Sequence, residues 1–493
     1  MARRRPNVIV IVSDTYRPDH IAANGHPFIK TPELDAFIQR SITFDRATVS
    51  SFPTIPMRTD WFTGRFSHPH HGWRDLAQPG GTLPAMLRQA GYTTQLIADT
   101  THMLRSGFWK PFDSFHFLRG HEGDKPLSRL NDPIQRAVTD LSKTRVERNN
   151  TTGRPTLADQ HVHTNFWRRY EDQSQIAQLA DVACRWIEDN YRGGPFMLWL
   201  DCFDVHEPWC PPPYLWRMYD PDYTGDELMI HPNYGSADAY TAAELANMRA
   251  LYAASCTLLA KHVGRVLRVI EDTGLLENTI VHFTCDHGTY LGERGRTGKS
   301  LIQPGKTDAF PMHCEISRIC WSMHVPPSLG LNTVAPGTRL PDLAQAPDLL
   351  PTLLELCGIE PPEVGPPQDI QIEGASLVPA MTGQPSASPR DIAITTWTTQ
   401  THHAADRLFC RRPTVTDGQW TLLLSEPPEA ARPRLYHVAD DLTEQDDLFD
   451  QHADEARRLH AAMILWLKQH GAPADAIDRL SVANCGLGAA GIA

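Results

Sequence analysis

Four short apolar runs, rich in β-branched residues and each followed by polar residues, constrain the fold of this chain most strongly. They are Val8–Val12, Thr94–Ala98, Phe196–Leu200 and Thr279–Thr284. Continuous apolar strands of this kind are typical of a largely parallel sheet that is covered on both faces. Amphipathic helical patterns such as Leu83–Ala90 and Ser174–Asn190 lie between the runs. Strands alternating with helices predict an α/β fold with a large mixed, mostly parallel sheet flanked by helices.

The chain has 493 residues, which is too long for one ordinary core and favours a large domain with a smaller one. A stretch rich in Pro, Ser and Gly, Pro379–Arg390, marks the expected boundary. We expect a main α/β domain over residues 1–385, a C-terminal α+β subdomain over 386–480, and a Gly/Ala-rich flexible tail or oligomerisation arm over 481–493. The subdomain should contain strands at Asp391–Trp397 and Gln419–Leu424 and a helix at Asp454–His470. Because such a tail can serve as an arm on a neighbouring subunit, a homo-oligomer is a further possibility.

Composition excludes several function classes. The net charge is −12, with basic residues interspersed among acids, so we expect neither a nucleic-acid partner nor a membrane-surface role. The apolar run after the basic N-terminus is about five residues, shorter than the roughly 7–15 of a signal-peptide core, and no run reaches the roughly 20 of a membrane span. Ten cysteines are scattered without paired spacing, which favours buried free thiols and a cytoplasmic location.

Acidic residues and a histidine follow the ends of two predicted strands. Asp14 follows the first apolar run, and Asp286-His287-Gly288 follows the fourth. Ligands of parallel sheets collect at the carboxyl ends of strands. A carboxylate and an imidazole on one tight turn suit a divalent cation that takes both oxygen and nitrogen ligands. A strand-end Asp that caps a turn and a His that packs under it are the ordinary alternatives.

A second segment carries a hydroxyl and a guanidinium in fixed relation. It reads Pro53-Thr54-Ile55-Pro56-Met57-Arg58. The flanking prolines restrict the backbone, so Thr54 is expected at a helix start, where an anion also binds. Arg58 falls one turn later on the same face, where it can hold an oxyanion or the nucleophile. An N-cap threonine and a surface ion pair are the simpler readings of these two residues.

Taken together, these segments resemble the alkaline phosphatase superfamily, and within it the branch of sulfatases and phosphonate monoester hydrolases. The matching segments occur in the family's order and cover nearly the whole chain: Asn7–Asp14, Lys30–Asp35, Pro53–Arg58, Gly91-Tyr92, Asp204–Pro208, Asp286–Gly288 with Gly298-Lys299, Asp348–Leu353, Gly374–Leu377 and Leu435–Val438.

The resemblance implies one divalent metal ion held by Asp14, Asp286 and His287, with the Thr54 oxygen as a further ligand. Arg58 would stabilise the nucleophile. The residues expected to face the transferred group or the leaving oxygen are Lys299, His206 and His102. A second Gly-Lys pair leaves open whether Lys299 or Lys306 enters the site. Asp201 and His206 are candidates for part of a second metal set, but one metal is expected.

Sulfatases oxidise a Cys or Ser to formylglycine at the position that Thr54 occupies here. Threonine can give at most a ketone, so no formylglycine is expected. A threonine ester must be cleaved by attack of water on the central atom, which favours phosphorus. We therefore expect a hydrolase of small anionic esters, namely phosphate mono- or diesters or phosphonate monoesters, that forms a phospho-Thr54 intermediate.

Two alternatives stay open. One is a sulfuric ester hydrolase or group transferase that uses unmodified Thr54. The other is a degenerate relative that binds an anion without turnover, suggested by Thr15 and Thr100, which stand where sulfatases usually have an acid and a lysine. Neither the natural substrate nor the leaving group can be read from the sequence.

Overall fold

The computed structural model describes residues 5–121, 124, 143, 161, 164–165, 167–225, 232–303, 306–360, 371–384, 390–399, 408–424, 432–482 and 484–487. Its centre is an eight-stranded sheet with the order β14-β2-β13-β8-β1-β6-β4-β5. Only β13 runs antiparallel to its neighbours in this sheet. The strands are β1 Asn7–Ser13, β2 Ile42–Thr48, β4 Thr93–Ala98, β5 Ser114–Phe117, β6 Phe196–Cys202, β8 Thr279–Cys285, β13 Trp321–His324 and β14 Arg339–Gln345. The mostly parallel sheet and all four predicted strands are confirmed.

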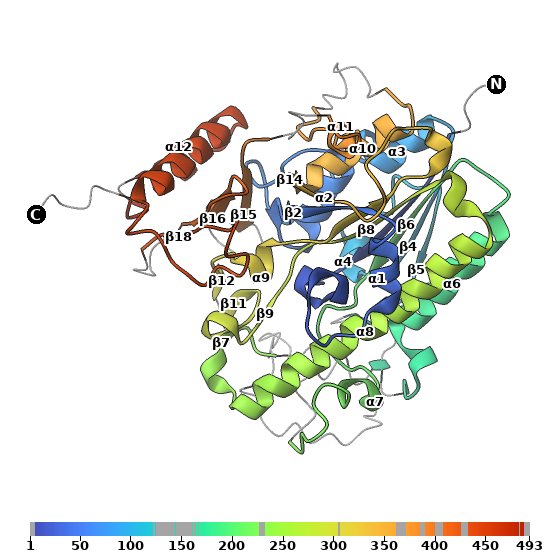
Figure 1. The fold of residues 1–493 in the computed structure, drawn as a ribbon, viewed down its shortest axis with the longest axis horizontal. Coiled ribbons are helices and arrows are strands. Elements are labelled where there is room, and N and C mark those ends of the chain that lie inside the picture. The colour runs from blue at the N-terminus through green and yellow to red at the C-terminus, as the bar shows by residue number, and fades with distance from the viewer. Residues whose placement is uncertain are drawn as a thin grey trace, which may run out of the picture.

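Helices cover both faces of this sheet (Figure 1). The long α8 packs with α1 and α6 on one side, and α2 packs with α3 and α10 on the other. The bounds are α1 Pro32–Ile38, α2 Thr54–Thr63, α3 Leu83–Gln89, α4 Thr101–Arg105, α6 Gln175–Asn190, α7 Pro213–Trp216, α8 Ala242–Asp272, α9 Cys314–Ser317, α10 Leu349–Leu356 and α11 Val378–Met381. This double cover explains why β1, β6 and β8 are buried along their whole length.

The register of the central strands aligns their carboxyl ends. Val12 of β1 pairs with Asp201 of β6 on one side and with Thr284 of β8 on the other, and Ala98 of β4 also pairs with Asp201. The residues that follow these strands therefore meet at one edge of the sheet. This edge is where parallel sheets bind ligands.

A second sheet lies toward the C-terminus, in the order β18-β17-β16-β15-β3. Its strands are β3 Ser51–Phe52, β15 Ala393–Thr399, β16 Leu408–Thr416, β17 Thr421–Leu423 and β18 Arg434–Tyr436, and the helices α12 Ala453–Gln469 and α13 Ala474–Arg479 follow. An apolar cluster of its own lies between this sheet and α12. The predicted strands near 391–397 and 419–424 and the predicted helix near 454–470 are present, whereas β16 was missed. Its run contains Arg411 and Arg412, which are buried because they pair with Asp308.

The strand β3 comes from the N-terminal part of the chain but joins the C-terminal sheet. Ser51 and Phe52 pair in parallel with Thr396 and Trp397 of β15. The segment that leads into Thr54 is therefore held by the part of the chain after residue 386. The sequence did not predict this connection, because β3 has only two residues and no periodic pattern.

The first half of the expected flexible tail is packed against the C-terminal part of the chain. Cys485 and Leu487 are each 2 % exposed and lie in the C-terminal apolar cluster, so this segment has more to bury than its Gly/Ala content suggests. Residues 488–493 fall outside the described part. Of the ten cysteines, eight are buried.

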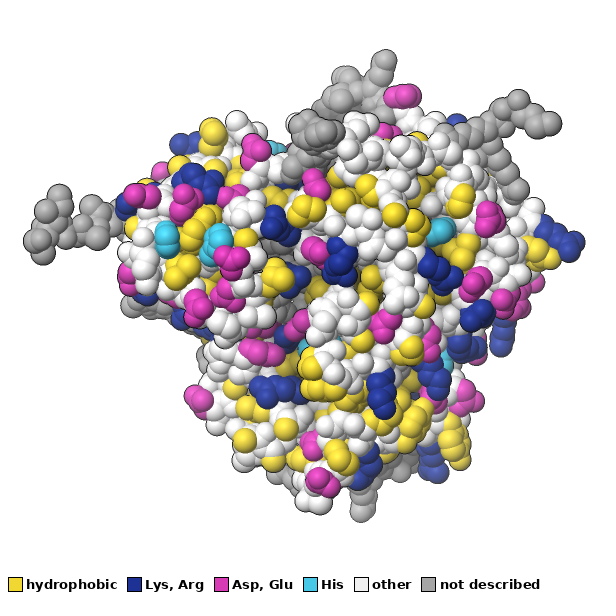
Figure 2. Space-filling model, in the orientation of Figure 1, with side chains coloured by type: hydrophobic (Ala, Val, Ile, Leu, Met, Phe, Trp, Pro, Cys, Tyr) yellow, Lys and Arg dark blue, Asp and Glu magenta, His cyan; other side chains and the backbone are white. Residues whose placement is uncertain are grey.

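The remaining described strands form two small sheets. β7 Gly235–Ser236, β10 Arg296–Gly298 and β9 Tyr290–Leu291 form one, and β11 Ser300–Gln303 and β12 Lys306–Ala309 form the other. No helix among the described residues combines the length and the apolar character needed to cross a membrane. Figure 2 shows basic and acidic side chains interspersed over the visible face, in keeping with the sequence.

Candidate active site

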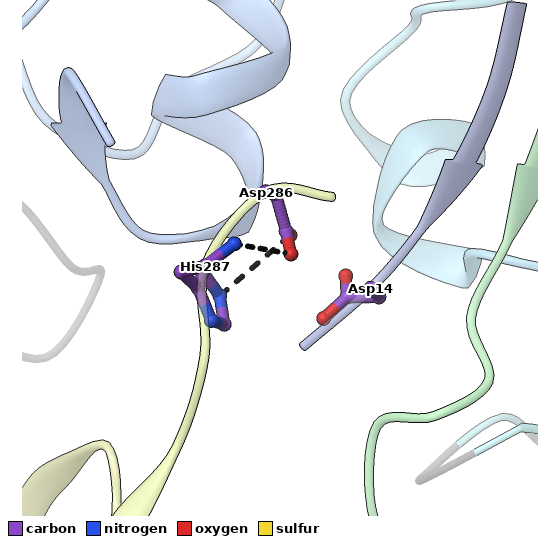
Figure 3. Close-up of side chains that lie close together, drawn as sticks. All are labelled: Asp14, Asp286 and His287. Atoms are coloured by element: carbon purple, nitrogen blue, oxygen red, sulfur yellow. Dashed lines mark hydrogen bonds and ion pairs between the residues drawn. The ribbon is translucent and has the colours of Figure 1, made fainter. Parts of the chain in front are cut away.

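The carboxyl ends of β1 and β8 bring Asp14, Asp286 and His287 together (Figure 3). One potential ligand atom from each residue lies within 4.8 Å of the other two, and all three side chains are fully buried. His287 Nε2 lies 3.6 Å from Asp286 Oδ2. The three residues predicted as metal ligands are therefore neighbours in space, although 272 positions separate Asp14 from Asp286 in the sequence.

The backbone fixes the outer atoms of this group. Asp286 Oδ1 accepts hydrogen bonds from the backbone N–H groups of Thr15 and His287, at 2.9 and 2.8 Å. His287 Nδ1 lies 3.1 Å from the Gly288 carbonyl oxygen, which leaves Nε2 facing the carboxylates. A side chain at Gly288 would place its Cβ 2.1 Å from the Glu315 carbonyl oxygen, which explains the glycine after the histidine. Outer hydrogen bonds of this kind orient metal ligands.

Within the described part of the chain, the inner atoms of the group make ion-pair contacts but no hydrogen bonds. Asp14 Oδ2 and His287 Nε2 are buried, and neither has a hydrogen-bond partner among the described residues. Buried polar atoms are nearly always paired with a donor, an acceptor or an ion. Two carboxylates and one imidazole are a donor set that suits a divalent cation. The residues present therefore fit the metal that the sequence predicts.

Burial controls the charges of the group. Burial, followed by repulsion from Asp286, raises the pKa of Asp14 well above its ordinary value, against the opposing effect of Arg58 and Lys299. Burial also acts to raise the pKa of Asp286, but His287 and Arg58 outweigh it and hold this pKa below its usual range. Burial lowers the pKa of His287 to about 4, so its ring is neutral near pH 7 and retains a lone pair for a ligand bond.

Arg58 is fully buried and its guanidinium faces protein oxygens on all sides. Nε and Nη2 bind Asp201, with a shortest distance of 2.7 Å, and Nη2 also lies 3.2 Å from Asp14 Oδ2. Nη1 donates to Asp286 Oδ2 at 2.7 Å and to the Thr54 carbonyl oxygen at 3.1 Å. All three guanidinium nitrogens of Arg58 thereby face protein oxygens. Arg58 holds the metal group and the start of α2 together, and its side chain is fully buried.

Asp201 is the main partner of Arg58. Its carboxylate also accepts hydrogen bonds from Thr100 Oγ1 at 2.5 Å and from Trp199 Nε1 at 3.1 Å. These donors take up the oxygens of Asp201, which agrees with the preference for one metal over a second set that would include Asp201. Thr100, where the sequence resemblance would place a lysine, therefore donates its hydroxyl to this carboxylate.

Thr54 is the first residue of α2 and is 3 % exposed. Its carbonyl oxygen accepts from Arg58, and no hydrogen bond of its hydroxyl is found within the described part of the chain. The N-cap position of α2 is Pro53, so Thr54 stands at the first helical position and not at the cap. The hydroxyl is thus free for chemistry at a helix N-terminus that favours negative charge.

Lys299 reaches the metal group through Thr15. Its Nζ donates to Thr15 Oγ1 at 2.8 Å, and this hydroxyl donates to Asp14 Oδ1 at 2.8 Å. Glu207 Oε2 lies 3.7 Å from Lys299 Nζ, and Tyr234 donates a hydrogen bond to the other oxygen of Glu207. Glu207 was not predicted as a site residue, although it lies in a quoted motif next to His206. The side chain of Lys306 lies outside the described residues.

The two predicted histidines lie on either side of Phe203. The His206 ring stacks on Phe203 with centroids 4.2 Å apart, and its Nδ1 lies 2.5 Å from the Glu207 carbonyl oxygen. His102 in α4 is half-buried, with its ring 4.9 Å from Trp73 and 6.1 Å from Phe203. His206 thus directly precedes Glu207, whose carboxylate lies near Lys299. The His102 ring is farther from Phe203 than the His206 ring is.

A second group of side chains of the types that bind metals was not predicted from the sequence. Asp99, His121 and Asp204 meet the same distance criterion of 4.8 Å as the first group. Asp99 follows β4, and this strand end was a usable signal. His121 lies beyond β5, in a segment that carries no motif.

Comparisons with known proteins find relatives over most of the chain. The family model named Sulfatase matches residues 6–359. An arylsulfatase of Clostridium perfringens is 24% identical over 410 residues, which cover 76% of this chain and 78% of that protein. The multifunctional alkaline phosphatase superfamily protein PehA of Trinickia caryophylli is 24% identical, with 82% and 80% covered. The crystal structure of a phosphonate monoester hydrolase of Agrobacterium radiobacter has the same fold, with a TM-score of 0.68, 20% identity, and 94% and 96% of the two chains covered.

Proposed function

The chain belongs to the sulfatase family, and we propose that it is a metal-dependent hydrolase of phosphate mono- or diesters or of phosphonate monoesters, acting through a covalent phospho-Thr54 intermediate. The observation that carries this proposal is the free hydroxyl of Thr54 at the start of α2, on a backbone that Arg58 ties to Asp14 and Asp286. No formylglycine is proposed, because that modification starts from a Cys or Ser and this position is Thr54.

Thr54 Oγ1 is the proposed nucleophile. It would attack phosphorus, form the Thr54 Oγ1–P bond and lose its proton, while the bond from phosphorus to the leaving oxygen breaks. A divalent cation bound by Asp14, Asp286, His287 and the Thr54 oxygen would lower the pKa of the hydroxyl and offset the charge of the phosphoryl oxygens. Water then attacks phosphorus of the phospho-Thr54 ester in line, gives its proton to the departing Thr54 oxygen and releases phosphate from a monoester, a phosphate monoester from a diester, or phosphonate from a phosphonate monoester.

Three further side chains would act on the substrate. Lys299 is a cation 2.8 Å from Thr15 Oγ1, close enough to the metal group to neutralise a non-bridging oxygen. His206 and His102 would protonate or hold the leaving oxygen, and both rings contact Phe203, at 4.2 and 6.1 Å between centroids. Arg58 would act as a positioning residue, since its guanidinium nitrogens already face protein oxygens.

Similarity to the arylsulfatase supports one alternative, a sulfuric ester hydrolase or transferase that uses unmodified Thr54. The degenerate, anion-binding alternative has less support. Thr15 and Thr100 replace residues of the family pattern, yet both are bonded into the site through Lys299 and Asp201.

Release of p-nitrophenol from four aryl esters would test the proposal. The substrates are the phosphate monoester, the phosphate diester, the phenylphosphonate and the sulfate, each offered to metal-loaded wild type, to Thr54→Ala and to Thr63→Ala. Thr63 lies on the same helix and donates its hydroxyl to the Thr59 carbonyl, so it is the matched control. We expect turnover of phosphorus esters by wild type and Thr63→Ala and at least a 10³-fold loss in Thr54→Ala. Turnover of the sulfate alone would refute the assignment to phosphorus esters, and equal rates in Thr54→Ala would refute the nucleophile.

A further inference from the structure

The group Asp99, His121 and Asp204 lies at the same edge of the sheet as the proposed active site. Asp99 directly follows β4, Asp204 comes two residues after β6, and His121 comes four residues after β5. His121 Nε2 lies 3.0 Å from Asp99 Oδ2 and 3.8 Å from Asp204 Oδ2. These three strands are neighbours in the sheet, which explains how residues far apart in sequence converge.

The atoms that face one another in this group lack hydrogen bonds. Asp99 is fully buried and His121 is 5 % exposed. Within the described residues, Asp99 Oδ2 and both ring nitrogens of His121 make no well-aligned hydrogen bond, and His121 Nε2 meets the two carboxylates as an ion pair. The proposed catalytic group has the same signature, since Asp14 Oδ2 and His287 Nε2 also make ion-pair contacts without a well-aligned hydrogen bond.

The distances fit ligands that share one ion. Carboxylate oxygens and imidazole nitrogens bind first-row divalent cations at about 2.0–2.2 Å. Two such ligands at right angles or at the tetrahedral angle are then roughly 3.0–3.6 Å apart, on the same geometry. The observed separations of 3.0 and 3.8 Å from Nε2 need only small shifts to meet it.

Hydrogen bonds from residues outside the group hold Asp99 and the backbone of Asp204 in place. Phe203 N–H donates to Asp99 Oδ1 at 2.7 Å, which leaves Oδ2 to face His121. Ser13 Oγ donates to the Asp204 carbonyl oxygen at 2.7 Å and fixes the backbone of that residue. Second hydrogen bonds of this kind orient metal ligands.

The local charge also favours a cation. Two carboxylates face one imidazole, so the group presents two acidic side chains to a single ring nitrogen. Arg168 faces the same carboxylates, but no ion pair within 4.0 Å joins it to either of them in the described part of the chain. The Asp204 side chain is 21% exposed, which gives an ion a path to the group.

We propose that Asp99, His121 and Asp204 bind a second divalent cation of the kind that takes mixed oxygen and nitrogen ligands, such as Mn²⁺ or Zn²⁺. The site is distinct from the proposed catalytic one. Asp99 and His121 follow β4 and β5, neither of which adjoins β1 or β8, and the two groups share no residue.

The proposed role of this cation is to position His206. The Phe203 ring lies between His121, at a centroid distance of 5.0 Å, and His206, at 4.2 Å. Asp204 precedes His206 by two residues on the same turn. A cation that joins Asp204 to Asp99 and His121 would therefore fix the segment that carries His206.

Metal counting on the full chain tests this inference independently of which ester is hydrolysed. Protein stripped with a chelator and reloaded with Mn²⁺ or Zn²⁺ would be analysed by mass spectrometry of the bound metal. We expect two equivalents in wild type, one in Asp204→Asn, and one in Asp286→Asn. Asp204→Asn is chosen because its carboxylate is partly exposed, so the change leaves no fully buried unpaired charge.

His121→Gln is the second variant, with His262→Gln as its control. His262 is also a buried histidine, but only one carboxylate, Glu171, lies within 4.0 Å of it in the described part of the chain. We expect one equivalent in His121→Gln and two in His262→Gln, with unchanged circular dichroism. A single equivalent in wild type, or a second equivalent that persists in both Asp204→Asn and His121→Gln, would overturn the inference.

Discussion

At the scale of single residues, the site is organised by buried charges whose partners all come from other elements. Arg58 in α2 binds two carboxylates that follow β1 and β8 and a third, Asp201, near the end of β6. Thr15 links Lys299 to Asp14 through one hydroxyl. The sequence could identify most of these residues, because they follow apolar strands. The sequence could not show which of these side chains contact one another, because the partners of Arg58 depend on the order of the strands in the sheet.

Replacement of Asp201 by Asn should weaken both the fold and the site. Loss of one partner from a buried ion pair costs about 3–5 kcal/mol, because the other charge stays buried. Arg58 would also hold Asp14 and Asp286 less firmly, which should lower metal affinity or kcat/KM about 10–100-fold. Chemical denaturation and metal titration measure the two effects.

Asp189→Asn is the control for this variant, because Asp189 is an exposed residue of α6. We expect a change within about 0.5 kcal/mol there. Equal stability and metal affinity in Asp201→Asn and wild type would show that Arg58 does not depend on Asp201.

Replacement of Lys299 by Gln should separate the two candidate lysines. Lys299 is buried and donates to Thr15, so its loss removes a cation from the proposed transition-state site and should lower kcat about 10²–10³-fold. Lys306→Gln should change kcat less than twofold. The reverse order of the two effects would assign the role to Lys306.

At the scale of elements, the strand ends were predictable and the short connecting strand was not. Apolar runs located β1, β4, β6 and β8, and the polar residues after β1 and β8 gave the proposed metal ligands. The two residues of β3 give no periodic signal, yet they join the C-terminal sheet just before Thr54. Trp397 of β15 packs against Phe52 of β3, and Phe52 packs against His287, with ring centroids 6.1 and 4.9 Å apart.

Trp397→Ala should therefore impair the site from a distance. The substitution removes a buried aromatic side chain, which costs about 3–5 kcal/mol. It also removes the support of Phe52 and His287, so metal affinity should fall. Trp420→Ala is the control, since Trp420 contacts His437 and His452 within the C-terminal part. Unchanged metal affinity in Trp397→Ala, or an equal loss in Trp420→Ala, would contradict this support.

At the scale of the whole molecule, the chain before residue 386 and the chain after it meet through buried polar contacts as well as through β3. Glu444 is 3 % exposed and accepts a hydrogen bond from the Cys314 backbone N–H at 3.0 Å. Burial, with Glu315 nearby, raises the pKa of Glu444 to about 8, against the opposing effect of that hydrogen bond, Arg294 and Arg318. Length and composition predicted two units, but such contacts depend on how the units pack and leave no pattern in the sequence.

The pKa of Glu444 predicts how stability depends on pH. A carboxyl group whose folded pKa is raised binds its proton more tightly in the folded state, so its contribution is fully present below about pH 4.5 and is lost as pH rises through about 8. Glu444→Gln keeps the acceptor and removes the ionisation. The Tm of this variant should exceed that of wild type by several degrees at pH 9, with a smaller difference at pH 5. Glu277→Gln, at an exposed position, should show no such trend. A Tm difference for Glu444→Gln that is the same at both pH values would contradict the pKa shift.

The covalent role of Thr54 is tested most directly by mass spectrometry of the acid-quenched, metal-loaded enzyme during turnover of a phosphate or phosphonate ester. The account predicts one added phosphoryl or phosphonyl group on the peptide that contains Thr54, and none on that peptide in Thr54→Ala. Turnover with no modified Thr54 under conditions where release of the group is rate-limiting, or a modification on another residue, would contradict it.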